Sequence, residues 1–150
     1  MGKDEFIRIK EWPTDYAQTA YNQDKFIEAI QVLHGFIETK LQELLILEGA
    51  KSNKIAEIWD IASQISLIHC VKFLFIIGEL NKKEYENILF FNKMRNQIMH
   101  ELFNETYENG VKGVSKNKFD IAFKQGIKLC DILEQKGEKK WNKKTPYNNL

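Results

Sequence analysis

An arginine, an asparagine and a histidine lie close together in the segment Met94-Arg95-Asn96-Gln97-Ile98-Met99-His100. His100 carries an imidazole, a group that can accept or donate a proton. The guanidinium of Arg95 stays charged and can hold two phosphate oxygens at once, while Asn96 adds neutral groups that could orient the histidine or a phosphate. We interpret Arg95, Asn96 and His100 as candidate catalytic residues for proton transfer beside a bound phosphate.

The segment lies on a predicted helix, and the position of Arg95 on that helix is unusual. At about 100° per residue, one side of the helix is apolar; that side carries Ile88, Phe91, Ile98, Met99 and Leu102. Arg95 falls in its middle, where an unpaired buried charge would be costly. We expect its guanidinium to reach solvent, to pair with a carboxylate, or to line a cleft or an interface.

The spacing of the three residues limits how they can act together. Asn96 and His100 are four residues apart, so their side chains lie one above the other and can share a ligand. Arg95 and His100 diverge by about 140° on a straight helix, which favours a cleft at a kink or a seam between two copies of the helix. In the alternative interpretation, Arg95 extends to solvent and His100 is simply exposed.

The pattern Phe91-Asn92-x-x-Arg95-Asn96-x-x-x-His100 resembles the Arg-polar-x-x-x-His signature of the HEPN superfamily. These higher eukaryotes and prokaryotes nucleotide-binding domains are small all-helical proteins that include many metal-independent ribonucleases. The likeness covers roughly Asp24 to Gln135, judged by helix order and pattern. It implies an all-α fold, an up-down four-helix bundle with the motif late in its third main helix, and a two-fold homodimer whose two motifs form one cleft.

The resemblance also implies a chemistry. RNA cleavage without a metal needs a base for the 2′-OH proton, cationic donors for the phosphorane oxygens and a proton for the leaving 5′-oxygen. His100 would be the general acid or base, Arg95 the phosphate clamp and Asn96 an orienting residue. The implied function is a metal-independent endoribonuclease of toxin or defence type, whose partners are RNA, a second copy and an antitoxin protein.

Two features of the sequence keep an alternative open. A toxin subgroup of the family, paired with nucleotidyltransferase antitoxins, has a tyrosine two residues after the histidine, where this chain has Leu102. The net charge is only +1, and no basic groove is evident. The alternative is a non-catalytic helical module that uses the motif for dimerisation or for holding a nucleotide or RNA phosphate.

Length and composition exclude several other classes of protein. A chain of 150 residues suits one domain that needs no disulfide or metal for stability. Cys70 and Cys130 have no close His or Cys at ligand spacing, and the glycines form no phosphate-binding loop, so we expect no metal and no cofactor. The first residues lack a signal-peptide core, and no apolar run reaches about 18 residues, which predicts a cytoplasmic protein without a membrane span.

The predicted organisation has three parts: an N-terminal arm or extra short helix over residues 1–22, the bundle over 23–137, and a flexible basic tail over 138–150. In the tail, lysines alternate with aromatics, a composition that suits either nucleic-acid contact or a frayed, solvated terminus. The first core helix should begin after an N-cap Asp24 and stop at Gly49. Its apolar stripe comprises Phe26, Ile30, Leu33, Ile37, Leu41 and Leu44.

The roles of three other polar residues can also be predicted. Glu38 is a candidate partner for Arg95, or else a solvated carboxylate on the flank of the helix. His34, on the same helix, and His69 are interpreted as structural histidines.

The remaining elements follow from periodicity and glycines. A second helix should bend near Ser66 to Val71 or end at Gly78, and its all-apolar run 73–77 should be buried on most sides. The third should run from about Lys82 to Asn104, followed by a loop over 105–113. The fourth should be capped by Ser115 or Asn117 and end at Gly137, burying Phe119, Ala122, Phe123, Ile127, Cys130 and Leu133.

Overall fold

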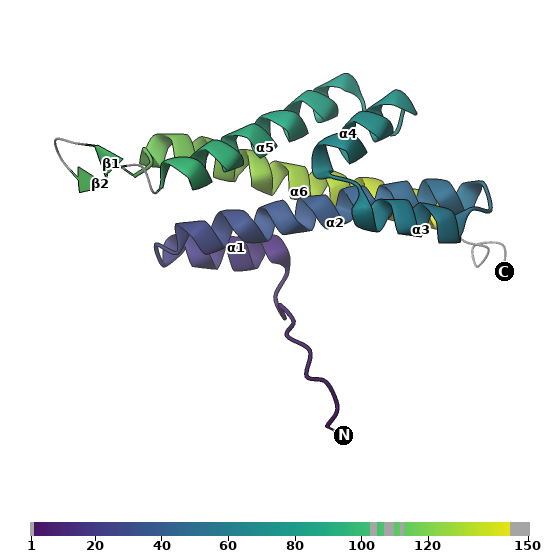
Figure 1. The fold of residues 1–150 in the computed structure, drawn as a ribbon, viewed down its shortest axis with the longest axis horizontal. Coiled ribbons are helices and arrows are strands. Elements are labelled where there is room, and N and C mark those ends of the chain that lie inside the picture. Colours follow the sequence, from purple (N-terminus) through teal and green to yellow (C-terminus); the bar gives the residue numbers. More distant parts are fainter. Residues whose placement is uncertain (1, 103–104, 107–109, 112, 145–150) are drawn as a thin grey trace.

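The computed structural model describes residues 2–102, 105–106, 110–111 and 113–144, and helices dominate it (Figure 1). The helices are α1 (Pro13–Asn22), α2 (Phe26–Lys51), α3 (Ile55–Gln64), α4 (Leu67–Ile76), α5 (Lys82–Glu101) and α6 (Lys116–Lys144). Within the predicted loop, β1 (Glu105–Thr106) pairs with β2 (Gly110–Val111) in a short antiparallel hairpin; residues 107–109 and 112 lie outside the described ranges. The prediction of an all-α fold is confirmed.

Helix α2 is the centre of the arrangement, because every other helix contacts it. In Figure 1, α2 and α6 run in one direction, while α5 and α1 run in the other, and residues before Pro13 lead away from the bundle. None of the helices in the described ranges is long and apolar enough to cross a membrane.

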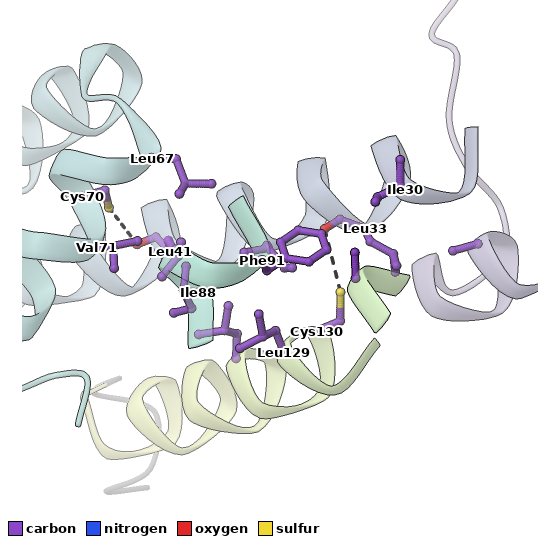
Figure 2. Packing of buried hydrophobic residues seen from close by; sticks show 14 of the residues in the cluster. Ile30, Leu33, Leu41, Leu67, Cys70, Val71, Ile88, Phe91, Leu129 and Cys130 are labelled. Atoms are coloured by element: carbon purple, nitrogen blue, oxygen red, sulfur yellow. Dashed lines mark hydrogen bonds between the residues drawn. The ribbon is translucent and has the colours of Figure 1, made fainter. Parts of the chain in front are cut away.

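The core follows the apolar stripe of α2, as its helical spacing predicts. The fully buried members are Ile30, Leu33, Ile37, Leu41 and Leu44, and Phe26 is half-buried. They meet Ile88 and Phe91 of α5 and Leu129 of α6 (Figure 2). Both cysteine thiols donate to carbonyls of α2, Cys70 to Leu41 at 3.6 Å and Cys130 to Leu33 at 3.9 Å. Burial raises their thiol pKa values, to about 11 for Cys70 and about 12 for Cys130.

The predicted ends of the first core helix are wrong. Asp24 is not the N-cap: it has φ +61° in the turn from α1, a conformation that Asp tolerates, and α2 begins at Phe26 after Lys25. Gly49 does not stop the helix, which continues to Lys51. A Cβ on Gly49 would lie 1.9 Å from Ile58 Cγ2, so this glycine is needed where α3 approaches α2 closely.

The predicted second helix is two helices. Ser66 ends the extended link after α3 and caps α4, with its Oγ accepting from the His69 backbone N–H at 3.3 Å. Gly78, at φ +83°, follows the last turn of α4. The chain therefore both breaks at Ser66 and ends its helix before Gly78.

The burial predicted for residues 73–77 is wrong. Only Leu74 is buried, whereas Phe73, Phe75 and Ile77 are exposed and Ile76 is 78% exposed. Helix α4 packs on α2 and α5, and the Phe75 ring stacks on Tyr85 of α5 with centroids 4.4 Å apart. Phe73 and Ile77 instead line a shallow hollow together with the exposed Ile61 of α3; we call these three side chains the α3–α4 face.

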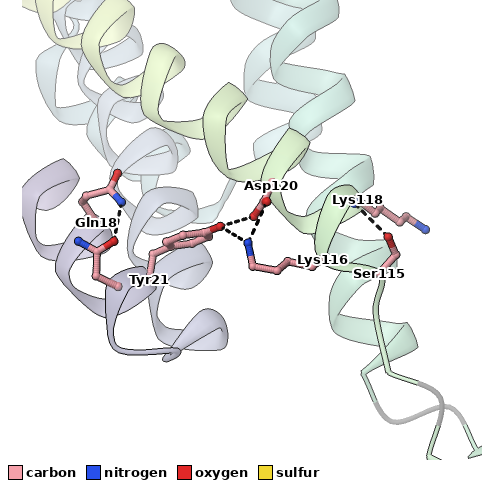
Figure 3. Close-up of polar contacts among 7 residues, drawn as sticks. Gln18, Tyr21, Ser115, Lys116, Lys118 and Asp120 are labelled. Carbon is pink, nitrogen blue, oxygen red and sulfur yellow. Dashed lines mark hydrogen bonds and ion pairs between the residues drawn. The ribbon is translucent and has the colours of Figure 1, made fainter.

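Helix α6 begins where predicted, because Ser115 Oγ accepts from the Lys118 backbone N–H at 3.3 Å (Figure 3). It does not end at Gly137 but continues to Lys144, so most of the predicted flexible tail that is described is helical. Lys140 explains this extension: it is only 8% exposed and forms ion pairs with Glu48 and, at 2.5 Å, with Glu79. Residues 145–150 of the tail lie outside the described ranges.

The N-terminal arm contains the short helix that was one of its two predicted forms. Ala17 and Ala20 of α1 are buried against the bundle, and Tyr21 ties α1 to α6. Its hydroxyl donates to Asp120 at 2.5 Å and accepts from Lys116 at 2.8 Å (Figure 3). The hydrogen bond from Tyr21 and the nearby Lys116 charge lower the pKa of the Asp120 carboxyl.

Candidate functional site

The helix that carries the motif starts as predicted, with a capping box. Asn81 Oδ1 accepts from the Glu84 backbone N–H at 2.8 Å, and Glu84 Oε1 accepts from the Asn81 backbone N–H at 2.9 Å. Two otherwise free amides are thereby satisfied at the start of α5. The helix is described to Glu101, and its predicted last residues 103–104 lie outside the described ranges. The motif occupies its final turns.

Arg95 lies on the core-facing side of α5, between the fully buried Phe91 and Ile98. Its half-buried guanidinium turns towards α2, where Nη2 donates to Gln31 Oε1 at 2.5 Å. Nη1 donates to Asn96 Oδ1 at 3.0 Å. Of the three environments expected for Arg95, the observed one is closest to the third: the guanidinium lies at the interface between α2 and α5.

Both hydrogen-bond partners of Arg95 are neutral amides. No carboxylate among the described residues forms an ion pair with it, and its Nε–H is buried without a partner in the same part of the chain. Of the five N–H groups of a guanidinium, two have a partner among the described residues. Within that part of the chain, no carboxylate offsets the positive charge of Arg95 at its half-buried position, where charges interact more strongly than in bulk water.

Glu38 is not the partner of Arg95. Its side chain is 42% exposed, and its Oε2 lies 4.0 Å from His34 Nδ1. Gln31 takes the place at the level of Arg95, and Glu38 is seven residues further along α2, about 10 Å along the axis. The alternative interpretation, a carboxylate on the solvated flank of the helix, describes Glu38 better.

A second cross-helix contact lies one turn from Arg95. His34 Nε2 is 3.3 Å from Oδ1 of Asn92, which is only 8% exposed. Burial and the neighbouring Arg95 charge lower the pKa of His34, against smaller raising effects from Asn92 and Glu38. His34 is therefore neutral at pH 7, with Nε2 as the donor to Asn92. We call Gln31, His34, Asn92, Arg95 and Asn96 the α2–α5 polar seam.

His100 is exposed, as is Asn96 one turn before it, and within the described residues no side chain hydrogen bonds to His100. Arg95 hydrogen bonds to Asn96. A single copy thus joins Arg95 and Asn96 by a hydrogen bond and leaves His100 outside that pair.

Sequence reasoning missed Gln31 and His34 as neighbours of the motif. They are three residues apart on the flank of the α2 stripe, and that spacing was the available signal. Asn92 was part of the quoted pattern, and its position four residues before Asn96 puts it on the row that leads to His100.

The seam suits an anion better than a metal ion. It presents a guanidinium, which repels metal cations, together with amide N–H donors, and the Nε2 atom of its imidazole, His34, hydrogen bonds to Asn92. Zn²⁺ needs several His, Cys or carboxylate ligands and Mg²⁺ needs carboxylate oxygens, which the seam lacks. No group of three or more His, Cys, Asp or Glu side chains that could hold a metal occurs among the residues searched, those that the structure describes.

No protein-family model, no curated protein and no solved structure matches this chain.

Proposed function

We propose that this protein is a metal-independent endoribonuclease of the HEPN type, in which Arg95 holds the scissile phosphate and His100 transfers the proton. The observation that carries the proposal is the set of partners of Arg95 in the α2–α5 polar seam. Arg95 is half-buried, and among the described residues its partners are the neutral amides of Gln31 and Asn96, which leaves N–H groups without a partner there. A guanidinium held in this way is preorganised for a phosphate.

The proposed reaction is attack of the ribose 2′-oxygen on the adjacent phosphorus. His100 removes the 2′-OH proton, the bond to the 5′-oxygen breaks, and that oxygen leaves with a proton from a protonated imidazole. Arg95 stabilises the charge on the non-bridging oxygens, and Asn96 keeps the guanidinium in place. The products are a 2′,3′-cyclic phosphate and a 5′-hydroxyl end, and no metal takes part.

The proposal includes a homodimer built around α5. Within one chain, Arg95 faces α2 and His100 faces solvent, so a second copy related by two-fold symmetry is needed to place His100 near Arg95. We propose that the helices form the HEPN-like up-down bundle in each copy. An antitoxin partner and a cytoplasmic location belong to the same proposal.

RNA cleavage in the presence of EDTA tests the function. His100→Ala should lower the cleavage rate by roughly 10²-fold or more while the fold is kept, because an exposed histidine contributes little packing. His69→Ala is the matched control: it removes another exposed helix histidine, on α4 and remote from the motif, and should leave the rate unchanged. Equal cleavage by wild type and His100→Ala, or a requirement for magnesium, would overturn the proposal.

A second candidate is a binding module without catalysis. The exposed α3–α4 face favours it, because a contiguous apolar surface on a small protein marks an interaction site. The same assay separates the two functions: RNA binding that depends on Arg95, without cleavage by the wild type, would select the binding module.

A further inference from the structure

An open hollow of about 520 Å³ lies beside the polar seam, within the size range of small-molecule sites, roughly 300–1,000 Å³. Its apolar walls are Ile9 of the N-terminal segment, Pro13 at the start of α1, and Val32 and Phe36 of α2. The other lining residues, all on α2, are Glu28, Gln31, Gly35 and Thr39. The Glu28 carboxylate accepts a hydrogen bond from the Tyr16 hydroxyl. We call this site the N-terminal hollow.

Gly35 has no structural role that explains its place inside a long helix. Two other helix-interior glycines are required by packing: a Cβ on Gly49 would meet Ile58 at 1.9 Å, and one on Gly126 would meet the Phe91 ring at 2.7 Å. A Cβ on Gly35 would meet nothing within 4 Å, although glycine weakens a helix relative to nearly any other residue. What Gly35 provides is open space over α2 in the hollow. Gly137 of α6 is equally open but lies away from the seam.

Gln31 connects the hollow to the proposed phosphate site. Its Oε1 accepts from Arg95 Nη2, and its amide N–H groups have no partner in the described part of the chain. The residue therefore belongs to the lining of the hollow and to the seam at once. A ligand whose anionic group contacts Arg95 would extend its neighbouring group past Gln31 into the hollow.

Phe36 gives the hollow an aromatic wall whose ring is held in place. The Trp12 ring packs against it edge-on with centroids 5.5 Å apart, and Lys40 Nζ lies 5.2 Å from its centroid. Nucleobases stack on aromatic side chains of this kind, with little dependence on base identity.

We propose that the N-terminal hollow binds an unpaired RNA base next to the phosphate held by Arg95. This inference rests on the proposed function and adds a substrate class to it: single-stranded RNA, with a base that contacts Phe36 and accepts a hydrogen bond from the Gln31 amide. Base-paired RNA would be a poor ligand because its bases remain stacked within the duplex.

The test compares Gly35→Leu with Gly137→Leu, using a non-cleavable 2′-O-methyl single strand and the same strand with abasic positions. Wild type and Gly137→Leu should bind the base-containing strand about tenfold more tightly than the abasic strand, by fluorescence anisotropy. Gly35→Leu should lose this preference because its side chain fills the hollow. Both variants should melt about 2 °C higher than wild type, which excludes misfolding as the cause.

The outcomes distinguish this proposal from the proposed function. If Gly35→Leu keeps the full preference for bases, the hollow is not a base site, whether or not the wild type cleaves RNA. If Gly35→Leu instead changes only the oligomeric state, the hollow accommodates a second copy and the base proposal fails. If Gly35→Leu loses the preference for the base-containing strand but the wild type cleaves no RNA, the proposal of a base site in the N-terminal hollow is supported and the nuclease proposal fails.

Discussion

Arg95 and Lys140 are two cations withdrawn from solvent on different helices, and their surroundings differ in charge. Lys140 of α6 lies between the carboxylates of Glu48 and Glu79, which join the ends of α2 and α4 to it. Among the described residues, Arg95 of α5 hydrogen bonds to the amide oxygens of Gln31 and Asn96 and to no carboxylate. Lys140 is therefore a cation with carboxylate partners, whereas the Arg95 charge is left for the ligand that we propose.

The difference separates two energetic roles. A buried ion pair contributes little net stability, but removal of one partner is costly because the other charge stays buried and unpaired. Amide partners carry no charge, so they can re-pair with each other or with water once the cation is gone. Stability should therefore depend on Lys140, and anion binding on Arg95.

Lys140→Met should have the largest effect on stability. It removes the ammonium group that pairs with both Glu48 and Glu79, which should lower the free energy of unfolding by about 3–5 kcal/mol and the melting temperature by roughly 10 °C. Thermal unfolding followed by circular dichroism measures this, and RNA affinity at a temperature where the variant is folded should not change. A melting temperature equal to that of wild type would mean that Lys140 is not a structural cation.

Arg95→Met should give the opposite pattern. The free energy of unfolding should change by less than about 1 kcal/mol, because Gln31 and Asn96 keep alternative partners. RNA affinity should fall about tenfold or more with the loss of charge-assisted hydrogen bonds, and Arg95→Lys should not restore it because a point charge cannot reproduce the planar fork. Anisotropy titrations at fixed salt measure the affinity. Wild-type affinity in Arg95→Met would mean that Arg95 does not contribute to RNA binding.

Protonation of His34 should make the stability of the protein depend on pH, and this is the smallest of the predicted effects. Its pKa in the folded protein lies below the ordinary value of 6.5, owing to burial first and then to Arg95, while the hydrogen bond with Asn92 and the Glu38 charge act less strongly in the other direction. The unfolded chain therefore takes up the proton first, and stability should fall as the pH drops through 6.5. Melting temperatures at about pH 7.5 and 5.5 should show a smaller loss for His34→Gln than for wild type; an equal loss would mean that His34 does not titrate as described.

The buried stripe of α2 and the helical placement of the motif in α5 could be predicted because both follow from helical periodicity. The stripe from Ile30 to Leu44 and the odd position of Arg95 are visible along one helix. Contacts between helices could not be predicted in this way. The partner of Arg95 on α2 is Gln31 and not Glu38, because the axial offset of α2 and α5 decides which residue lies opposite.

Other differences between the predicted and observed structure also come from contacts between helices. Gly49 and Gly137 look like helix stops in isolation, but close packing against Ile58 explains the first, and the ion pairs of Lys140 stabilise the helix beyond the second. The run 73–77 is apolar on every side, yet only Leu74 is buried among its five residues, and Phe75 contacts α5 through Tyr85 while staying partly exposed. Apolar composition alone does not tell which sides of a helix its neighbours cover.

Mixing two inactive variants is the most direct test of the proposed composite site, in which Arg95 of one copy acts with His100 of the other. Arg95→Ala and His100→Ala should each be inactive, whereas subunit exchange between them should form heterodimers with one intact Arg95–His100 pair and restore about a quarter of the wild-type RNA cleavage rate. Mixing either variant with more of itself is the control. If the mixture stays inactive although exchange is shown by mass, and the wild type cleaves RNA, then the two residues do not act across a dimer and the composite site is wrong.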